Sequence, residues 1–311
     1  MRATHEAPAV RDLALMPRTR LSRELRAAFE FWLLPFALAL LPYRLGIAAA
    51  RLSARWFPLY PELTDAGAAQ WHALTGGGDE RAWRAEFRFG QLVDHADLFW
   101  SLMRSRSFLL KRLGAPAPDC PRDRPLLVLS FHYGQGLWLL HWLAAHGHPP
   151  RFVSIRFARE DCDSTLRYAY AKLRIATVAR LAVAAPIFTG GARREIAQTL
   201  QRQGTVYGLL DVPTSDDPGR AVNAKVLGRD VCLPAGLLES AAEHATAALV
   251  LTARVVADGS RRVEAESFAL AGSLSVERAG ELLTRRIEEA PAAWHFWYLW
   301  PTIEAPAGMR R

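Results

Sequence analysis

The spacing of apolar residues changes partway along the chain, and the change separates a helical region from an alternating one. Over residues 80–113, apolar side chains recur at helical spacing with charges between them, which predicts a helix. After residue 125, short apolar runs alternate with amphipathic stretches. Short apolar runs bounded by turn residues are typical of buried strands, so this part is predicted to alternate strands and helices.

The predicted elements follow one another without an internal repeat. We expect strands at 126–131, 152–155, 186–188, 205–210, 247–256 and 262–268. We expect helices at 136–145, 163–174, 192–203, 235–244 and 275–289, with Gly204 as the C-cap of the third and a hairpin over 222–233. The segment 114–125 is rich in proline and charge and is predicted to be a connector. This order predicts the α/β fold class, with a mixed central sheet flanked by helices.

An apolar run from Phe31 to Tyr43 follows a charged N-terminal tail. It is shorter than the roughly 20 residues that a membrane-spanning helix needs, and Pro35 and Pro42 would interrupt a straight helix. Arginine, tryptophan and tyrosine residues flank the run, as is typical of segments that lie at a membrane interface. We therefore expect an interfacial or re-entrant anchor, with a hydrophobic helix packed on the protein itself as the alternative.

These patterns divide the chain into two regions. Residues 1–65 are expected to form an N-terminal tail and a helical membrane-associating segment, and residues 66–311 an α/β domain. The formal net charge of +8 favours anionic partners, such as a membrane surface with anionic headgroups or an acidic carrier protein. No zinc-finger spacing, aromatic RNA-binding signature or Lys/Arg tract accompanies the charge, so no nucleic-acid partner is expected.

The cysteine and histidine spacings indicate neither a disulfide framework nor a metal site. Cys120, Cys162 and Cys232 lie far apart and form no CxxC pair. We expect free thiols and a catalytic part in the reducing cytosol. His146 and His148 lie in a Gly/Pro turn with no third ligand at a familiar spacing, so no metal is expected there.

The strongest candidate for chemistry is His132, in the segment SFHYGQG at residues 130–136 directly after a predicted strand. Reactive groups collect at the carboxyl ends of strands in α/β sheets. A histidine there can remove a proton from a hydroxyl or amine that attacks a thioester, and the glycines allow a substrate to approach closely. On this pattern alone, a lone histidine is more often structural than catalytic.

This segment resembles the catalytic box of the lysophospholipid acyltransferase superfamily, in its bacterial lipid A lauroyl/myristoyl acyltransferase branch. In that box a strand ends in histidine, then an aromatic residue and often a glycine, as His132, Tyr133 and Gly134 do here. Further segments resemble the family in the same order. They are LDVP at 210–213, LGR at 227–229 with LPAG at 233–236, and APAAWHFW at 290–297. The similarity covers most of residues 25–300 and includes the N-terminal apolar run.

The resemblance implies the acyltransferase fold and a membrane-associated enzyme of the bacterial inner membrane, with its catalytic domain on the cytoplasmic side. Such an enzyme moves a fatty acyl group from an acyl carrier protein or coenzyme A thioester to a membrane lipid or glycolipid, without a further cofactor. His132 would be the general base, and Tyr133 and Gly134 would contact substrate. Backbone amides near Gly134, or a side-chain donor, would stabilise the oxyanion.

One position departs from the box, because Leu137 stands where the family has a carboxylate that orients the histidine. Three explanations are open. Another carboxylate, with Asp211 as the first candidate, reaches His132 from a neighbouring strand end. Alternatively, His132 acts without a partner, at a cost of about a hundredfold or more. Finally, the protein is a catalytically degenerate, membrane-associated lipid- or acyl-binding protein of the same fold. A turn-forming role for Asp211 ahead of Pro213 is equally open.

Two arginines complete the candidate substrate site. Arg229 could pair with a phosphate or with the phosphopantetheine of the donor, because its planar fork matches phosphate geometry, and an exposed hairpin arginine is the alternative. Arg156 follows the strand 152–155 and is placed to meet an acidic substrate. Trp294 and its aromatic neighbours are interpreted as packing, with an acyl channel or a membrane interface as the alternative.

Overall fold

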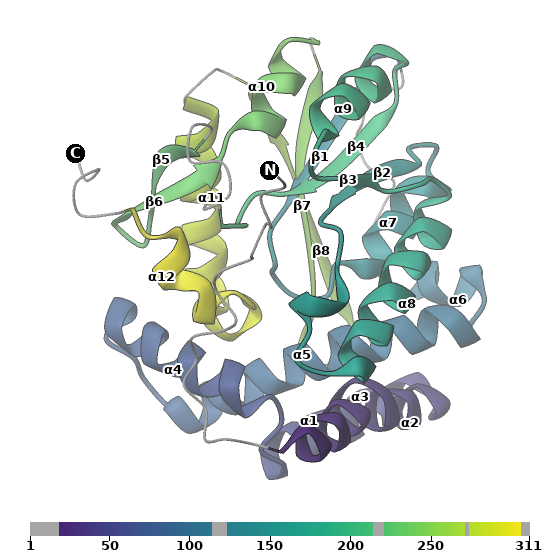
Figure 1. The fold of residues 1–311 in the computed structure, drawn as a ribbon, viewed down its shortest axis with the longest axis vertical. Coiled ribbons are helices and arrows are strands. Elements are labelled where there is room, and N and C mark those ends of the chain that lie inside the picture. The colour runs from purple at the N-terminus through teal and green to yellow at the C-terminus, as the bar shows by residue number, and fades with distance from the viewer. Residues whose placement is uncertain (1–18, 114–122, 214–220, 245, 271–273, 306–311) are drawn as a thin grey trace.

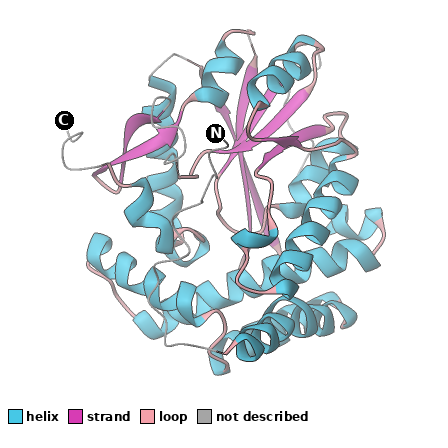
Figure 2. Cartoon of the chain, in the orientation of Figure 1, coloured by secondary structure: helices cyan, strands magenta, loops and turns pink. Residues whose placement is uncertain are grey.

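A six-stranded sheet with helices around it forms the centre of the molecule (Figures 1 and 2). The computed structural model describes residues 19–113, 123–213, 221–244, 246–270 and 274–305. The strands are β1 Leu126–Ser130, β2 Pro150–Ser154, β3 Ile187–Phe188, β4 Thr205–Leu209, β7 Ala247–Val255 and β8 Arg261–Phe268. Their order is β3-β2-β4-β1-β7-β8, and every neighbouring pair is parallel except β7–β8. The predicted mixed α/β sheet flanked by helices is therefore confirmed.

A separate two-stranded antiparallel sheet, β5 Ala221–Val226 and β6 Arg229–Pro234, forms the predicted hairpin. The helices after residue 60 are α4 Pro61–Thr75, α5 Glu80–Met103, α6 Arg106–Leu113, α7 Leu137–Ala145, α8 Thr165–Ala182, α9 Ala192–Gln201, α10 Gly236–Ala242, α11 Leu274–Glu289 and α12 Trp300–Ile303. Short 3-10 turns are η2 Arg159–Asp161, η4 Pro291–Ala293 and η5 Trp297–Leu299. Most of the predicted connector 114–125 and of the predicted N-terminal tail lies outside the described residues.

Three details of the predicted helices are wrong. The helix predicted over 163–174 begins at Thr165 and continues to Ala182. The helix predicted over 80–113 is two helices, because Arg104 adopts an extended conformation. Its guanidinium turns back and donates to the carbonyls of Ala39, Leu40 and Leu41, which α2 leaves without intrahelical partners. The helix predicted to end at Gly204 ends at Gln201, and the residue in the left-handed conformation is Gln203, at φ 61°.

The two faces of the sheet carry two hydrophobic cores. Along β1, Leu126 and Val128 belong to one core and Leu127 and Leu129 to the other, because successive side chains of a strand alternate. The first core is shared with α2, α3, α5, α7 and α8, and the second with α4, α9, α10, α11 and the C-terminal segment. Every residue of β1 is buried, which explains why this strand is a continuous apolar run in the sequence.

The apolar N-terminal run forms several helices rather than one. α1 Arg20–Ala27 continues through a π-helical stretch, η1 Ala28–Leu33, into α2 Leu34–Leu40, and α3 Tyr43–Trp56 follows a bend. Pro35 has no N–H with which to continue the helical hydrogen bonds, and Pro42 lies at the bend. Among the described residues, no helix combines the length and the apolar character needed to cross a bilayer. One side of α2 and α3 packs against α5, so this segment is partly core.

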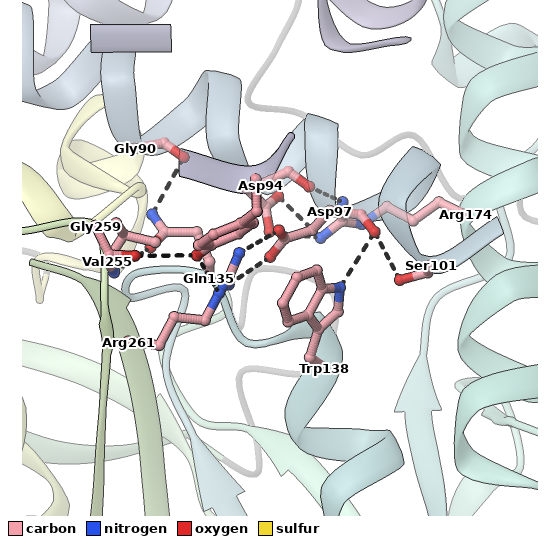
Figure 3. A network of polar contacts seen from close by, with 11 residues as sticks. Gly90, Asp94, Asp97, Ser101, Gln135, Trp138, Arg174, Val255, Gly259 and Arg261 are labelled. Atoms are coloured by element: carbon pink, nitrogen blue, oxygen red, sulfur yellow. Dashed lines mark hydrogen bonds and ion pairs between the residues drawn. The ribbon is translucent and has the colours of Figure 1, made fainter. Parts of the chain in front are cut away.

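A buried polar network fastens α5 to the sheet (Figure 3). Asp97 of α5 receives two hydrogen bonds from Arg261 of β8, at 2.8 and 2.5 Å, and both side chains are fully buried. Gln135, in the segment after β1, donates to the carbonyl of Gly90 on α5 at 3.2 Å and accepts from the N–H of Val255 at 2.8 Å. These contacts hold α5, β7 and the residues after β1 in one fixed arrangement.

Candidate active site

His132 and Asp211 meet because each follows the end of one of two adjacent parallel strands. In the pairing of β1 with β4, Ser130 lies opposite Leu209. The N–H of Leu210 extends this pairing by donating to the carbonyl of Ser130 at 3.0 Å. His132 and Asp211 each lie two positions beyond that pair and therefore emerge side by side at the carboxyl edge of the sheet. The strand register thus brings together the two residues that the sequence predicted for catalysis.

The two residues are joined by two hydrogen bonds. The Nδ1 atom of His132 lies 2.9 Å from Oδ1 of Asp211, and the backbone N–H of His132 donates to Oδ2 at 2.8 Å. The Asp211 side chain is fully buried, whereas 27% of the His132 side chain is exposed. A carboxylate only accepts hydrogen bonds, so the proton is assigned to Nδ1. This tautomer leaves the lone pair of Nε2 to accept a proton from a substrate.

A carboxylate from another strand lies beside His132, whereas position 137 carries a buried leucine. Leu137 begins α7, is 4% exposed and belongs to the hydrophobic core of that face. Asp211 occupies the Nδ1 side of His132 instead. The contact that the first of the three explanations requires is therefore present in the structure.

The C-terminal segment packs directly onto this pair. Trp294, fully buried, donates its indole N–H to Oδ2 of Asp211 at 2.8 Å. The backbone N–H of His295 donates to the carbonyl of His132 at 2.7 Å. The ring of Phe296 stacks on the His132 imidazole, with centroids 3.6 Å apart and an interplanar angle of 16°. One face of the imidazole is thus covered.

Gly134 is required for the path of the chain after His132. It adopts φ 64°, and a Cβ atom there would lie 2.1 Å from the carbonyl oxygen of Ala253. Only glycine combines this conformation with such a close approach. The position serves the backbone turn, and the predicted contact of Gly134 with substrate stays a prediction.

The backbone amides of Tyr133, Gly134 and Gln135, which are among those expected to stabilise an oxyanion, already have acceptors. The N–H groups of Tyr133, Gly134 and Gln135 donate to the carbonyls of Phe131, Ala293 and Ala253, at 2.7, 2.8 and 2.7 Å. These three donors are thus used inside the protein, and an oxyanion site at another backbone amide or at a side-chain donor stays a prediction.

The other predicted substrate-binding residues lie in different settings. Tyr133 is 3% exposed, pairs with Trp294 in an antiparallel bridge, and burial raises the pKa of its hydroxyl to about 12. Arg156 follows β2 at the same edge of the sheet as His132, and its guanidinium lies 4.4 Å above the centre of the Phe188 ring.

Arg229 is exposed at the tip of the β5–β6 hairpin, outside the six-stranded sheet. Its placement matches the alternative of an exposed hairpin arginine. Within the ranges that the structure describes, no three or more histidine, cysteine, aspartate or glutamate side chains form a group that could hold a metal ion.

The sequence interpretation missed the role of Trp294 and Phe296. Trp294 belongs to the aromatic cluster that is interpreted as packing, and nothing local distinguishes an indole that packs from one that donates to a carboxylate 83 positions earlier. The family resemblance marks the segment 290–297, but it assigns no partner to Trp294.

Comparison with known proteins adds no family assignment, because no family model matches the chain and no curated protein is significantly similar to it. The resemblance to acyltransferases therefore depends on the residues and motifs themselves.

Proposed function

We propose that this protein is a membrane-associated acyltransferase that moves a fatty acyl group from an acyl carrier protein or coenzyme A thioester to a lipid or glycolipid. The observation that carries the proposal is the pairing of His132 with Asp211. The carboxylate is fully buried and bound to Nδ1 of a partly exposed histidine. This is the arrangement of a general base whose tautomer and orientation are fixed by an acid.

In the proposed reaction, Nε2 of His132 accepts the proton of the acceptor hydroxyl or amine while the acceptor's oxygen or nitrogen attacks the thioester carbonyl. The resulting tetrahedral intermediate carries its negative charge on the former carbonyl oxygen. When it collapses, the carbon–sulfur bond breaks, and the imidazolium returns its proton to the departing thiolate. Asp211 favours the transient imidazolium by its negative charge. The products are an acylated lipid and a free thiol, with no net change at His132.

A membrane location for this reaction is supported by the N-terminal helices. Their outward side carries large apolar residues that are 37–68% exposed. They are Leu21, Leu25, Phe29, Leu33, Phe36, Leu40, Leu41, Leu45, Leu52, Trp56 and Phe57. The spacing of the first six follows one side of a helix, because residues three or four apart lie on the same face. An apolar face of this extent is typical of a membrane-binding or protein-binding surface.

The charges around this face favour an anionic membrane. Arg20, Arg23, Arg44 and Arg55 are exposed on the same helices. The two acidic residues of this segment are engaged elsewhere: Glu24 accepts hydrogen bonds from the N-terminus of α8, and Glu30 is 2% exposed. Exposed arginines beside an apolar helix face are attracted to anionic lipid headgroups.

The proposal is tested by an acyl-transfer assay with total membrane lipids as acceptors. The donors are acyl carrier protein and coenzyme A, each carrying a radiolabelled fatty acyl group as a thioester. We expect a labelled lipid with the wild type and its loss with His132→Ala and with His132→Gln. The labelled product would identify the acceptor.

His72→Gln is the matched control, since His72 pairs with Glu80 near the end of α4 and is 38% exposed at its side chain. It should label lipid as the wild type does. Equal labelling by the His132 variants would remove His132 from the mechanism. Absence of labelling by the wild type with both donors would favour the lipid- or acyl-binding protein.

A further inference from the structure

We infer that Trp294 is a positioning residue for the proposed catalytic pair, so that indole, carboxylate and imidazole act as one hydrogen-bonded unit. This inference rests on the proposed function for its catalytic meaning. Its geometric basis is the 2.8 Å hydrogen bond from the indole Nε1–H of Trp294 to Oδ2 of Asp211.

The two oxygens of Asp211 have separate tasks. Oδ2 accepts from the indole of Trp294 and from the backbone N–H of His132, each at 2.8 Å. Oδ1 lies 2.9 Å from Nδ1 of His132. Two donors on one oxygen fix the carboxylate plane, and the other oxygen is thereby directed at the imidazole. Of the two donors to Oδ2, one is the backbone N–H of His132, and Trp294 provides the second.

A hydrogen bond does not follow automatically when an indole is buried in this protein, since several other indoles are buried without a partner among the described residues. The Nε1 atoms of Trp83, Trp100, Trp142 and Trp300 are buried and have no hydrogen-bond partner among the described residues. Packing alone thus places tryptophans here without directing their N–H groups to acceptors. The indole N–H of Trp294 is directed at the one carboxylate that contacts His132.

The backbone around Trp294 holds it in register with the site. Trp294 lies opposite Tyr133 in an antiparallel bridge. On either side of this bridge, His295 donates to the carbonyl of His132 at 2.7 Å, and Gly134 donates to the carbonyl of Ala293 at 2.8 Å. A shift of the C-terminal segment would therefore move the indole, the carboxylate and the imidazole together.

The chemical consequence follows from the donor character of indole. Indole N–H donates and does not accept, so it uses Asp211 as a hydrogen-bond acceptor, the same role in which Asp211 meets Nδ1–H of His132. Without this donor, Oδ2 would keep a single hydrogen bond in a fully buried place, and the carboxylate could rotate away from Nδ1. Loss of a hydrogen bond to a charged group of this kind lowers the rate by about 10- to 100-fold.

The test compares Trp294→Phe with Trp297→Phe in the acyl-transfer assay. Trp297 is the matched control. It is also fully buried, its ring centre lies 5.1 Å from that of Trp294, and its N–H donates to the carbonyl of Pro291 at 2.7 Å. Each substitution removes one indole N–H and a similar volume. We expect kcat to fall about 10- to 100-fold in Trp294→Phe at nearly constant KM, and to stay within about twofold of wild type in Trp297→Phe.

Equal effects of the two substitutions on kcat would overturn the inference, since packing would then account for both. An unchanged kcat in Trp294→Phe would overturn it as well.

Proton NMR tests the same unit without relying on activity. The Nδ1–H proton of His132 should give a low-field resonance, assigned by its loss in His132→Gln. We expect this resonance to shift or broaden in Trp294→Phe and to remain in place in Trp297→Phe. An identical resonance in both variants and in the wild type would contradict the positioning role. If the wild type transfers no acyl group, the proposed function fails, and the NMR comparison still decides whether Trp294 positions the pair.

Discussion

At the scale of the residue, the function proposed here depends on which carboxylate meets His132. Asp211 takes this place from the end of β4, with 2.9 Å between Oδ1 and Nδ1. Leu137, at the position where the resembling family carries its acid, packs into the hydrophobic core instead. The imidazole has only one Nδ1, so a carboxylate at one of these positions makes one at the other unnecessary.

We expect that Leu137→Glu does not increase acyl transfer and lowers the free energy of unfolding by about 3 kcal/mol or more. The reason is that Nδ1 of His132 is already bound, while the new carboxyl would replace a side chain that is 4% exposed among apolar neighbours. Denaturant unfolding and the acyl-transfer assay measure the two effects. Leu137→Met is the control and should cost less than about 1.5 kcal/mol. A glutamate variant that is both stable and more active would show that position 137 still reaches the histidine.

At the scale of the element, the N-terminal helices have two different sides. Towards the sheet, residues such as Leu38, Ala39 and Ile47 are buried in the core shared with α5. Away from it, large apolar side chains are exposed among arginines. The interpretation of the apolar run as a helix packed on the protein therefore holds for the inward side, and the interfacial anchor stays a prediction for the outward side.

We expect the combined substitution of Leu21, Leu25 and Leu33 by serine to weaken binding to vesicles of phosphatidylglycerol and phosphatidylethanolamine by about 100-fold or more. These side chains are 67%, 62% and 63% exposed, so their replacement removes apolar contact with lipid while leaving the core intact. Vesicle co-sedimentation measures the binding. Val183→Ser is the control, because Val183 is 68% exposed at the end of α8 far from α1. Unchanged binding by the triple variant would assign the apolar face to another partner.

At the scale of the whole molecule, polar contacts link elements that lie far apart in the sequence. The ion pair of Asp97 with Arg261 links α5 to β8, and Trp294 links the C-terminal segment to the end of β4. His295, next to Trp294 in the chain, is also buried. It is 8% exposed, and burial lowers its pKa to about 4. A histidine that is kept neutral in this way makes stability depend on pH.

We expect the stability of the wild type to fall relative to His295→Gln as the pH decreases from about 6.5 to about 4. In this range the unfolded chain binds a proton at His295, with its ordinary pKa of about 6.5, whereas the folded protein does not. Protonation therefore favours the unfolded state, by about 2–3 kcal/mol near pH 4. Above pH 7 the effect is absent. Denaturant unfolding of both proteins at a series of pH values measures the difference, and parallel pH curves would contradict the assignment.

The order and type of the elements after residue 125 were predictable from the sequence, because hydrophobic periodicity is a local signal. The strand at 247–256 and the helix at 275–289 differ by at most one residue at each end from β7 and α11. The break at Arg104 was not predictable in this way. It is stabilised by contacts of the guanidinium with the end of α2, more than 60 positions away.

The sequence by itself determined that a histidine follows the first strand of an α/β sheet and an aspartate the fourth. Only the tertiary structure decided that they meet, since strand order and register place them together across 79 positions of sequence. The same holds for Trp294, whose indole reaches the carboxylate through a pairing of the C-terminal segment with the residues after β1. Periodicity reports the face on which a side chain lies, whereas a hydrogen-bonded site depends on distances between elements that are set when the sheet assembles.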